Sequence, residues 1–334
     1  MIRSTPSMAR RFLTVLAVGV GVVGSALASA SPVRVERYES ISDDGPVRGF
    51  LAWVDLSALG VEVVVTGPAE GLVHERAKAA LTPTDAWLDE HGLTLAVNAN
   101  FFAWLGDRSS PRAEADLIGL SVSDGKVISP ERSFGGRADP VLFIDAEGRA
   151  HIGYGAGSSE PVHAVAGIGG SPNDSTPGTL LVEAGVNTGA TARVQPSVRH
   201  PRTAAGVSED GRTLMLAVID GRRSEWSIGA SLPELAEIMI GMGAHAALNL
   251  DGGGSTSFVY IDGQGERLVN RPSDGRMRAV ANHLGVRVER EGNRETEESD
   301  PAASAGVGAI PERSGGPGFV GNGSVSLVCE ERQS

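Results

Sequence analysis

The sequence predicts an α+β fold in a single domain, a hairpin-rich mixed β-sheet with a few packed helices over residues 31–288. Three observations lead to this class. Short apolar runs bounded by turn residues recur from Val33 to about Val288. Asp-Gly and Glu-Gly pairs separate several of these runs, which is typical of antiparallel hairpins. Only two segments place apolar residues at helical spacing, so regular crossover helices between parallel strands are not expected.

The predicted strands follow one another with few interruptions. The clearest apolar runs are Phe50–Leu56, Val61–Thr66, Leu93–Val97, Val141–Asp145 and Leu214–Asp220. Asp124-Gly125 separates Leu117–Ser123 from Lys126–Ser129 and predicts a tight hairpin. Further hairpin turns are expected at Glu147-Gly148, Asp210-Gly211 and Asp262-Gly263.

Two segments carry helix signals. Thr82-Pro83-Thr84-Asp85 combines a capping residue, a proline in the first turn and an acidic third position, and predicts a helix over Ala86–His91. Ser231 and Glu234 have the spacing of a capping box, and the apolar residues after them keep a helical period up to Gly243. We expect the apolar stripe of this second helix to pack in the core and not to bind a cofactor.

Both ends of the chain differ from its body. Three arginines precede an uncharged run from Phe12 to Ala30 that ends in Ala-Ser-Ala, which indicates a secretory signal peptide over residues 1–30. An uncleaved membrane anchor is the alternative, because the run is nearly long enough to span a bilayer. Residues 289–334 are acidic and rich in Gly, Ser and Pro, and we expect a disordered tail. The protein is therefore expected to be secreted or periplasmic, with no transmembrane segment once the signal is removed.

Composition narrows the partners and cofactors. The formal net charge is −12, which argues against duplex nucleic acid as a partner. Cys329 is the single cysteine, so an intramolecular disulfide and a cysteine-based metal cluster are both excluded. The histidines show no HxH or HxxxH pairing, and no twelve-residue calcium loop is present. No cofactor is expected to be required; the metal ligands are unknown, and a structural divalent cation such as calcium stays open.

The stretch AALNLDGGGSTSFVY, residues 246–260, raises the main functional question. Three consecutive glycines are entropically costly, so something must need bare backbone beside Asp251. The glycines are not followed by the lysine of a phosphate-binding P-loop, and Ser257 stands where a nucleophile elbow around Ser255 needs its second glycine. Two interpretations remain: a corner where backbone crosses backbone, and a ligand held close to exposed amides beside the carboxylate.

Other predicted strands end in polar residues. Asn98 follows an apolar run, and the aromatic Phe102 after it could cover a sugar ring, although an Asx turn followed by core aromatics is the plainer interpretation. Arg202 and Arg222 lie at the far ends of a predicted hairpin, Thr203–Val207 with Leu214–Ile219, and Asp220 lies beside them. Antiparallel pairing would bring these charges together at one sheet edge. A surface ion-pair cluster is the alternative.

Taken in order, these motifs resemble one known family. The matching segments are Asn98-x-x-Phe101-Phe102, Gly119, Asp124-Gly125-Lys126, His200-Pro201-Arg202-Thr203, Asp220-Gly221-Arg222, Asn249-Leu250-Asp251-Gly252-Gly253-Gly254-Ser255-Thr256 and Arg278-x-Val280-x-Asn282-x-Leu284-Gly285-Val286. Each motif alone is weak, but together they resemble the phosphodiester glycosidase family over roughly Val47 to Val288.

The resemblance implies hydrolysis of a sugar-1-phosphodiester, similar to a GlcNAc-1-phosphodiester, at the glycosidic C–O bond, releasing sugar and a phosphomonoester. Such a leaving group needs charge neutralisation more than protonation. Asp251 would act as nucleophile or base, and Asp220 as second carboxylate or as orienter of an arginine. The substrate-binding residues would be Asn98, Phe102, Arg202, Thr203, Arg222, Asn249, Gly252, Gly253, Gly254, Ser255 and Thr256. Within this set, Arg202 and Arg222 would clamp the phosphate.

Two alternatives belong to other functional classes. The chain could be a non-catalytic binder of cell-surface glycan or glycan phosphate, using the same pocket without turnover. It could also be a phosphodiesterase that cleaves P–O instead of C–O.

Overall fold

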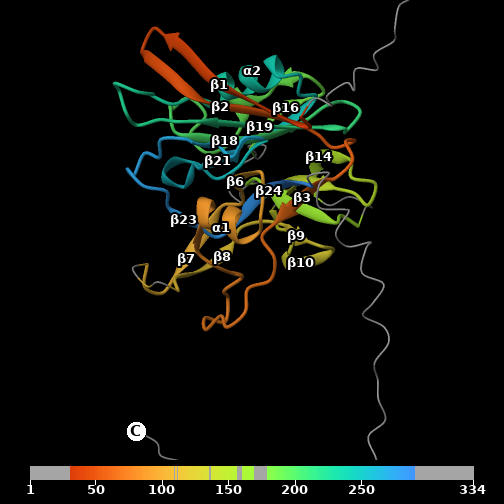
Figure 1. Cartoon of the computed structure of the whole chain (residues 1–334). Helices are drawn as coiled ribbons and strands as arrows, with labels where there is room; N and C mark the ends of the chain where they lie inside the picture. Colours follow the sequence, from red (N-terminus) through yellow and green to blue (C-terminus); the bar gives the residue numbers. More distant parts are fainter. Residues whose placement is uncertain are drawn as a thin grey trace, which may run out of the picture. The chain divides into compact units, whose positions relative to one another are not determined.

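Two antiparallel sheets face each other across the main hydrophobic core (Figure 1). The computed structural model describes residues 31–108, 110, 112–134, 137–155, 160–168 and 179–289. They fall within one compact unit that ends at Glu289. Every strand pair among these residues is antiparallel.

The strands are divided among three larger and three smaller sheets. The seven-stranded sheet contains, in spatial order, β1 (Val33–Ser42), β2 (Gly45–Asp55), β19 (Thr213–Ile219), β18 (Arg202–Val207), β20 (Ala246–Asn249), β16 (Leu180–Glu183) and β17 (Val186–Asn187). One five-stranded sheet contains β22 (Arg267–Val269), β21 (Phe258–Ile261), β6 (Leu95–Asn98), β24 (His283–Val288) and β3 (Val61–Val65). The other contains β10 (Lys126–Ser129), β9 (Ser121–Ser123), β15 (His163–Ala166), β13 (Pro140–Ile144) and β14 (Ala150–Tyr154).

The smaller sheets have two or three short strands each. They pair β4 (Ala79–Ala80) with β8 (Glu114–Leu117) and β7 (Phe102–Leu105), β5 (Thr82–Pro83) with β23 (Ala279–Val280), and β11 (Ser133–Phe134) with β12 (Arg137–Ala138).

Both hairpins on which the sequence argument depends are confirmed. Asp124 and Gly125 have φ of 48° and 71° and join β9 to β10, as a type I′ turn requires. Strands β18 and β19 pair in a register that sets Arg202 opposite Ile219. Asp220, the next residue, therefore lies beside Arg202 at the same sheet edge.

The predicted α+β class is confirmed only in part. The described residues contain 24 strands but only two α-helices, so the domain is mostly β. The other helical elements there are two 3-10 turns, η1 (Gly189–Thr191) and η2 (Gly253–Ser255). Short turns join most consecutive strands, and an antiparallel arrangement does not need crossover helices, which explains why few are present.

The main core lies between the seven-stranded sheet and the sheet of β6, β21 and β24. Along β2, Phe50, Ala52 and Val54 point into this core, while Leu51 and Trp53 point to the opposite face, as the two-residue period of a strand dictates. Phe50 and Phe258 stack across the core with ring centroids 4.8 Å apart. This packing holds the two sheets, and the strand ends that leave them, in a fixed relation.

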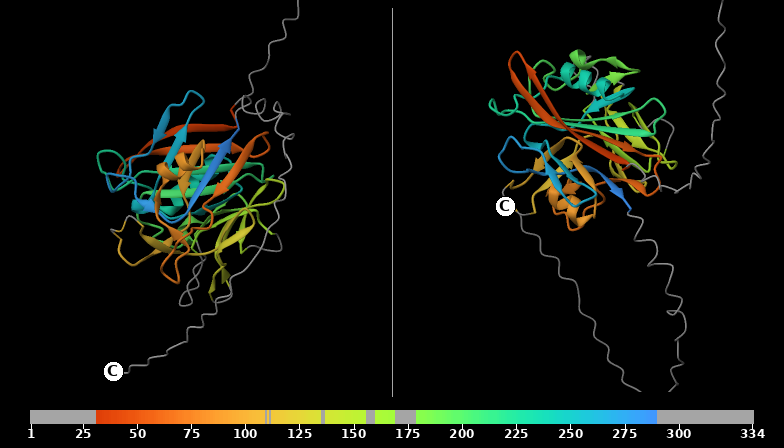
Figure 2. Two further views of the ribbon diagram at one scale, coloured as in Figure 1. Left: turned by 60° about the horizontal axis from the view of Figure 1, so that its bottom comes forward. Right: turned by 45° about the horizontal axis from the view of Figure 1, so that its top comes forward.

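One helix covers the outer face of each facing sheet, as Figure 2 (right) shows. α2 (Leu232–Gly241) begins with the predicted capping box of Ser231 and Glu234, which is confirmed. Its Leu235 and Met239 pack against the seven-stranded sheet, which bears out the interpretation of its apolar stripe as core.

α1 (Thr84–Glu90) covers the five-stranded sheet, but its predicted cap is wrong. Pro83 is the capping residue and provides no side-chain hydrogen bond, because Thr82–Pro83 pairs with β23 instead. The hydroxyl of Thr84 contacts that of Ser257 at 2.6 Å.

The ends of the chain are not described. The predicted signal peptide, residues 1–30, and residues 290–334 of the predicted tail lie outside the described residues and stay predictions. Among the described helices, none has the length and apolar character needed to cross a membrane.

Acid should destabilise the domain through His283. This ring is buried, stacks on Trp87 with centroids 4.7 Å apart, and its Nδ1 lies 2.9 Å from the Thr66 hydroxyl. Burial lowers the pKa of His283 to about 3, so the unfolded chain takes up the proton first as pH falls below about 6.5. Stability is therefore present above that pH and is lost between about 6.5 and 3, at up to about 1.4 kcal/mol per pH unit.

In thermal unfolding from pH 7 to 4, His283→Gln should flatten this dependence of stability on pH, and His74→Gln, at an exposed site, should not. An unchanged slope in His283→Gln would contradict the assignment.

Candidate active site

The glycine-rich turn connects the two facing sheets at one end of the core. β20 ends at Asn249 in the seven-stranded sheet, and β21 begins at Phe258 in the five-stranded one. Between them, the amide of Leu250 donates to Thr203 O at 2.9 Å and the amide of Asp251 donates to Ala99 O at 3.0 Å. The chain thus leaves one sheet and bonds to the other at Asp251, which fixes this residue between the two sheets.

Asn98 holds the segment between β20 and β21 in place through three side-chain hydrogen bonds. Its Nδ2 donates to Asp251 O at 2.6 Å, and its Oδ1 accepts from the Thr203 hydroxyl at 2.7 Å and the Ser257 amide at 3.1 Å. Asn98 and Thr203 are both buried. These bonds occupy the polar atoms of Asn98 with protein groups, so it positions Asp251 and does not itself present a free amide to a substrate.

Bare backbone is needed at all three glycines because other groups lie against them. A Cβ at Gly252 would lie 2.8 Å from Pro201 O, and one at Gly254 would overlap the Arg278 guanidinium at 1.9 Å. Gly253 has φ of +63°, and a Cβ there would lie 3.1 Å from Arg222 Nη2. The interpretation of a corner where backbone crosses backbone fits Gly252, guanidinium groups lie against Gly253 and Gly254, and a ligand at the glycine amides stays a prediction.

Two of the three glycine amides are already bonded. Gly252 N donates to Asp251 Oδ1 at 2.8 Å, and Gly253 N donates to Pro201 O at 2.9 Å. These contacts do not fit the expectation that the amides of Gly252 and Gly253 bind substrate oxygens. Their role is to fix the Asp251 carboxylate and the turn.

Asp251 is the carboxylate at this turn. The residue is half-buried, and its side chain accepts from Gly252 N and is hydrogen-bonded by Ser255. Burial raises the pKa of Asp251 to about 6, against the lowering effects of Ser255, Gly252 and the nearby Arg278 charge. A carboxylate with this pKa is ionised at neutral pH but basic enough to take a proton from water.

Arg222 and Arg278 flank the turn. Arg222 is exposed, has φ of 60°, and its Nη2 lies 3.4 Å from His200 Nδ1. It forms no ion pair with a carboxylate among the described residues. Arg278 donates to Asp274 through Nε at 3.0 Å and Nη2 at 2.6 Å. The Arg222 guanidinium lies against Gly253 and the Arg278 guanidinium against the next residue, Gly254. Together they make a rim of guanidinium groups along the turn that follows Asp251.

Arg202 does not belong to this rim. It is buried, and its guanidinium donates to four carbonyls: Ala230 O, Val194 O, Gln195 O and Val198 O, at 2.9–3.1 Å. Burial, and then the charge of Arg222, lower the pKa of Arg202 to about 10, which leaves it charged at neutral pH. These contacts commit the Arg202 guanidinium to the adjoining loop and do not fit the phosphate clamp expected at this position.

Asp220 is likewise buried and fully engaged. Its oxygens accept from Trp226 Nε1 and Asn270 Nδ2, both at 2.9 Å, and from the Arg271 amide at 3.1 Å. Burial raises the pKa of Asp220 in spite of these bonds. The exposed guanidinium of Arg271 stacks 3.7 Å from the Trp226 ring centroid. Of the two roles expected for Asp220, orienting neighbouring groups fits these contacts, and the role of second reacting carboxylate does not.

Three further predicted site residues have differing contacts. The Asn249 Oδ1 and Thr256 Oγ1 atoms are buried and have no hydrogen-bond partner. Phe102 is half-buried on β7, with its ring centroid 5.3 Å from that of Trp104. Phe102 packs against a small apolar cluster, so the plainer interpretation of it as a packing aromatic fits better than a sugar platform.

Sequence reasoning missed the site role of Arg278 and Asp274. The signal was present, because Arg278 begins the last of the quoted motifs. Nothing in the sequence indicated, however, that it would lie against Gly254. The described residues contain no group of three His, Cys, Asp or Glu side chains that could hold a metal ion, and a structural calcium ion stays an open prediction.

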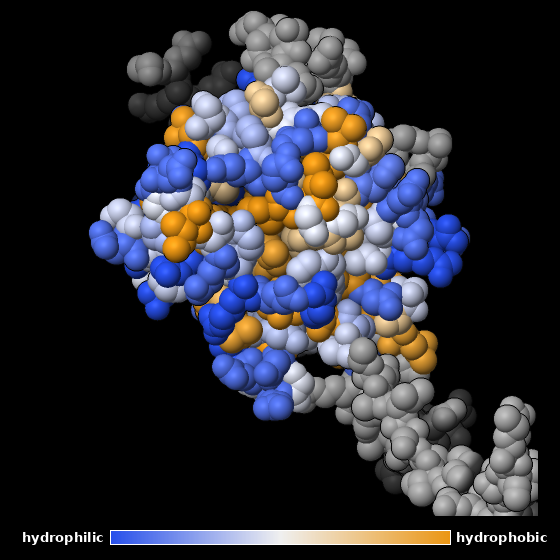
Figure 3. Space-filling view, turned by 90° about the horizontal axis from the view of Figure 1, so that it is seen from above, coloured by the Kyte–Doolittle hydropathy of each residue, from blue (hydrophilic) through white to orange (hydrophobic). Residues whose placement is uncertain are grey.

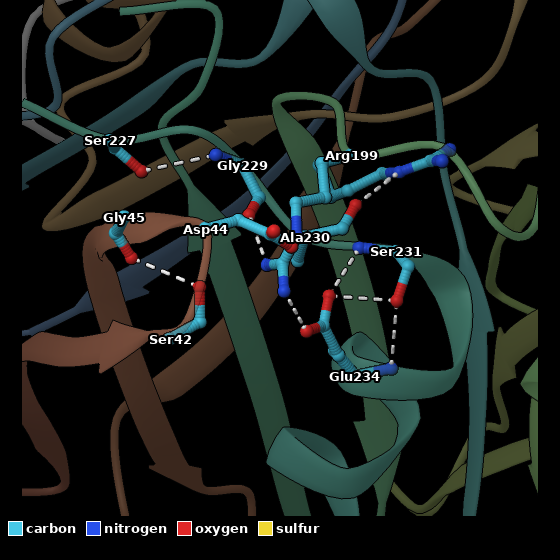
Figure 4. A network of polar contacts seen from close by, with 10 residues as sticks. Ser42, Asp44, Gly45, Arg199, Ser227, Gly229, Ala230, Ser231 and Glu234 are labelled. Carbon is cyan, nitrogen blue, oxygen red and sulfur yellow. Dashed lines mark hydrogen bonds and ion pairs between the residues drawn. The ribbon is translucent and has the colours of Figure 1, made fainter. Parts of the chain in front are cut away.

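Away from the glycine-rich turn, a hollow of about 740 Å³ lies between the β1–β2 hairpin and α2. Figure 3 shows apolar surface among hydrophilic side chains on this face. Figure 4 shows its polar wall, where Arg199 contacts Asp44 and Glu234 and thereby ties the β1–β2 turn to the start of α2. None of the predicted site residues lines this hollow.

Comparison with known proteins finds the same family that the ordered motifs resemble. A family model described as phosphodiester glycosidase matches residues 91–287. The chain is similar in structure to the zebrafish N-acetylglucosamine-1-phosphodiester alpha-N-acetylglucosaminidase catalytic domain auto-inhibited by its pro-peptide, with 21% identity, a TM-score of 0.56, and coverage of 79% of this chain and 85% of that one. It is also similar to an exported protein of Burkholderia pseudomallei K96243, with 20% identity, a TM-score of 0.51, and coverage of 73% and 74%. No curated protein matches the sequence. At these identities the structural likeness concerns the fold.

Proposed function

The chain belongs to the phosphodiester glycosidase family, and on this premise we propose that it hydrolyses a sugar-1-phosphodiester at the bond between the anomeric carbon and the glycosidic oxygen. One observation carries the proposal: a carboxylate whose pKa is raised to about 6 lies at a glycine-rich turn covered by the guanidinium groups of Arg222 and Arg278. The proposed products are the free sugar and a phosphomonoester.

The charges at the turn match what this reaction requires. A phosphodiester leaving group is a weak base, so its departure needs neutralisation of negative charge more than a proton. Arg222 has no carboxylate partner among the described residues, and its guanidinium is exposed. In the proposal, Arg222 binds the phosphate directly, and Arg278, held in place by Asp274, contributes its charge from the other side of the turn.

Asp251 supplies the base. In the proposal, its carboxylate takes a proton from a water molecule as that water attacks the anomeric carbon, and the C–O bond to the phosphate breaks. Asn98 and Thr203 fix the backbone of Asp251 from the buried side. A non-catalytic anion binder would gain nothing from a desolvated carboxylate beside the anion, so the contacts favour turnover over binding alone.

Bond cleavage in isotopically labelled water tests the function. The purified chain is incubated with a panel of sugar-1-phosphodiesters, beginning with a GlcNAc-1-phosphodiester, in oxygen-18 water, and the products are analysed by mass spectrometry. We expect the label in the sugar. Label in the phosphate would mean P–O cleavage, and saturable binding without product would mean a binding protein; either result would overturn the proposal.

The anomeric configuration of the released sugar should be inverted. A retaining glycosidase needs a second carboxyl group to activate water in its second step. Asp220 is buried under four hydrogen bonds and Asp274 is paired with Arg278, so Asp251 is left as the one reacting carboxylate among the described residues at the turn. Proton NMR recorded within the first minutes, before mutarotation, should show the β-sugar from an α-linked substrate. Initial release of the α-sugar would instead assign Asp251 as a nucleophile.

A further inference from the structure

A second hollow adjoins the glycine-rich turn on the far side of Arg278. Its volume is about 510 Å³, and it lies where β5, β7 and β23 approach one another. Arg278 and Asp274 form part of its wall, and the same two side chains lie within 2.5 Å of where a Gly254 Cβ would be. Arg278 is also close enough to Asp251 to lower its pKa. One residue thus separates the hollow from the reacting carboxylate.

The hollow is positively charged. Arg108, Arg276 and Arg278 line it together with one carboxylate, Asp274. Arg278 is already paired with Asp274. Arg276 is exposed and has no hydrogen bond or ion pair within the part of the chain that the structure describes. A free guanidinium at the mouth of a hollow is suited to a carboxylate or phosphate of a ligand.

Much of the remaining lining of the hollow is apolar. Trp104 is half-buried and packs by its ring against Phe102, and Met277, Leu81 and Pro83 complete the surface. The Arg108 guanidinium lies 5.4 Å from the Trp104 ring centroid. A half-buried indole in the lining of a hollow is a group on which a planar ring can stack.

These walls suit the leaving side of the substrate better than the sugar. A sugar-binding pocket needs free acceptors for hydroxyl groups, and the single carboxylate in the hollow is engaged by Arg278. A phosphate held between Arg222 and Arg278 would direct the group beyond it past Arg278. That group would meet Trp104 and Arg276.

We propose that this hollow is the aglycone subsite and that it selects aglycones carrying a planar group and a further negative charge. Trp104 stacks on the planar group and Arg276 pairs with the charge. The inference rests on the proposed function, because it assumes that a phosphodiester is held at the glycine-rich turn. Trp104 and Arg276 are specificity-determining residues in this scheme, and neither touches the reacting bond.

Three synthetic substrates with the same sugar test the subsite. They are GlcNAc-1-phosphodiesters whose aglycones are methyl, benzyl and 4-carboxybenzyl. We expect kcat/KM to rise about tenfold from methyl to benzyl through stacking, and about fivefold more for the carboxylate, with both gains in KM. Trp104→Ala should remove the first gain and Arg276→Gln the second, while each variant treats the methyl substrate as the wild type does.

Controls separate the outcomes. Arg149→Gln changes an exposed arginine of another hollow, near Leu56 and Arg212, and should leave all three values unchanged. Trp104→Phe keeps a planar ring and should keep most of the benzyl preference, which covers the case in which Trp104→Ala does not fold. Equal kcat/KM for the three substrates in the wild type would overturn the subsite and leave the proposed function intact. If the wild type hydrolysed none of them, the proposed function would fail and the subsite with it.

Discussion

Asp251→Asn is expected to lower kcat about 10³-fold or more, the upper part of the range for removing a general base. Asparagine is nearly isosteric and can still accept the hydrogen bond that Gly252 N donates to Oδ1, so the turn should keep its shape. It has no basic oxygen to take a proton from water. The measurement is steady-state hydrolysis of a sugar-1-phosphodiester, with Asp43→Asn, at an exposed site in the β1–β2 turn, as the matched control.

The pH profile gives the same prediction a second readout. Because the pKa of Asp251 is raised to about 6, kcat/KM of the wild type should increase as pH rises to about 6 and level off above it. Residual activity of Asp251→Asn should lack this limb. A profile with no inflection near pH 6, or wild type and variant that turn over substrate alike, would remove Asp251 from the reaction.

Stability separates loss of chemistry from loss of structure. Burial raises the pKa of Asp251, so the folded protein loses stability as pH rises from about 4 to 6 and the carboxylate ionises against its surroundings. Asp251→Asn avoids this cost. Above pH 6 the variant should therefore unfold at a temperature at least as high as the wild type, although it is inactive. This is the expected trade between stability and activity at a functional carboxylate.

The sequence was a better guide to which strands pair than to which side chains face the candidate site. Turn signals at Asp124-Gly125 and Asp210-Gly211 set the hairpins, and the β18–β19 register then brings Arg202 and Asp220 to one edge. The resemblance of the ordered motifs predicted the family, which the family model confirms. Local turn chemistry is readable from a single chain because it depends on neighbouring residues only.

The orientation of side chains just beyond the strand ends could not be predicted from local sequence. Arg202 and Arg222 occur in similar sequence settings, yet Arg202 is buried under carbonyls and Arg222 is exposed over Gly253. The two-residue period that orients side chains within a strand does not apply once the strand has ended. Arg222 also adopts a positive φ, which redirects its side chain, and nothing in its sequence requires that conformation.

The same limit explains Asn98 and the helix cap. Asn98 was expected to read hydroxyl groups, and it instead joins residues more than a hundred positions away. Thr82 was expected to cap a helix, and it instead pairs with β23. In each case a contact with a residue distant in sequence overrides the local preference. Patterns within a short window of sequence do not contain that contact.

Arg202→Met should cost about 3–5 kcal/mol of folding free energy, since it removes the four hydrogen bonds that the buried Arg202 guanidinium donates to carbonyls. The loss falls on a strained loop, because Val194 and Gln195 have φ of 69° and 57° and the carbonyls of both accept hydrogen bonds from Arg202. Differential scanning calorimetry should show a fall in Tm of about 10 °C for a domain of this size. Arg202→Lys, which keeps the charge but not the fork of donors, should lie between the wild type and Arg202→Met, and the exposed Arg212→Met should change little.

The same substitution distinguishes a supporting arginine from a phosphate ligand. Pro201 O accepts the Gly253 amide at 2.9 Å, so loosening the loop that Arg202 holds should also loosen the glycine-rich turn. Activity measured well below the lowered Tm should therefore fall in kcat as well as in KM, and by less than in Asp251→Asn. A variant with the wild-type Tm and a rise in KM alone would show that the guanidinium binds the substrate phosphate directly. That outcome would restore the role expected from the sequence and would require the four carbonyl contacts to open when substrate binds.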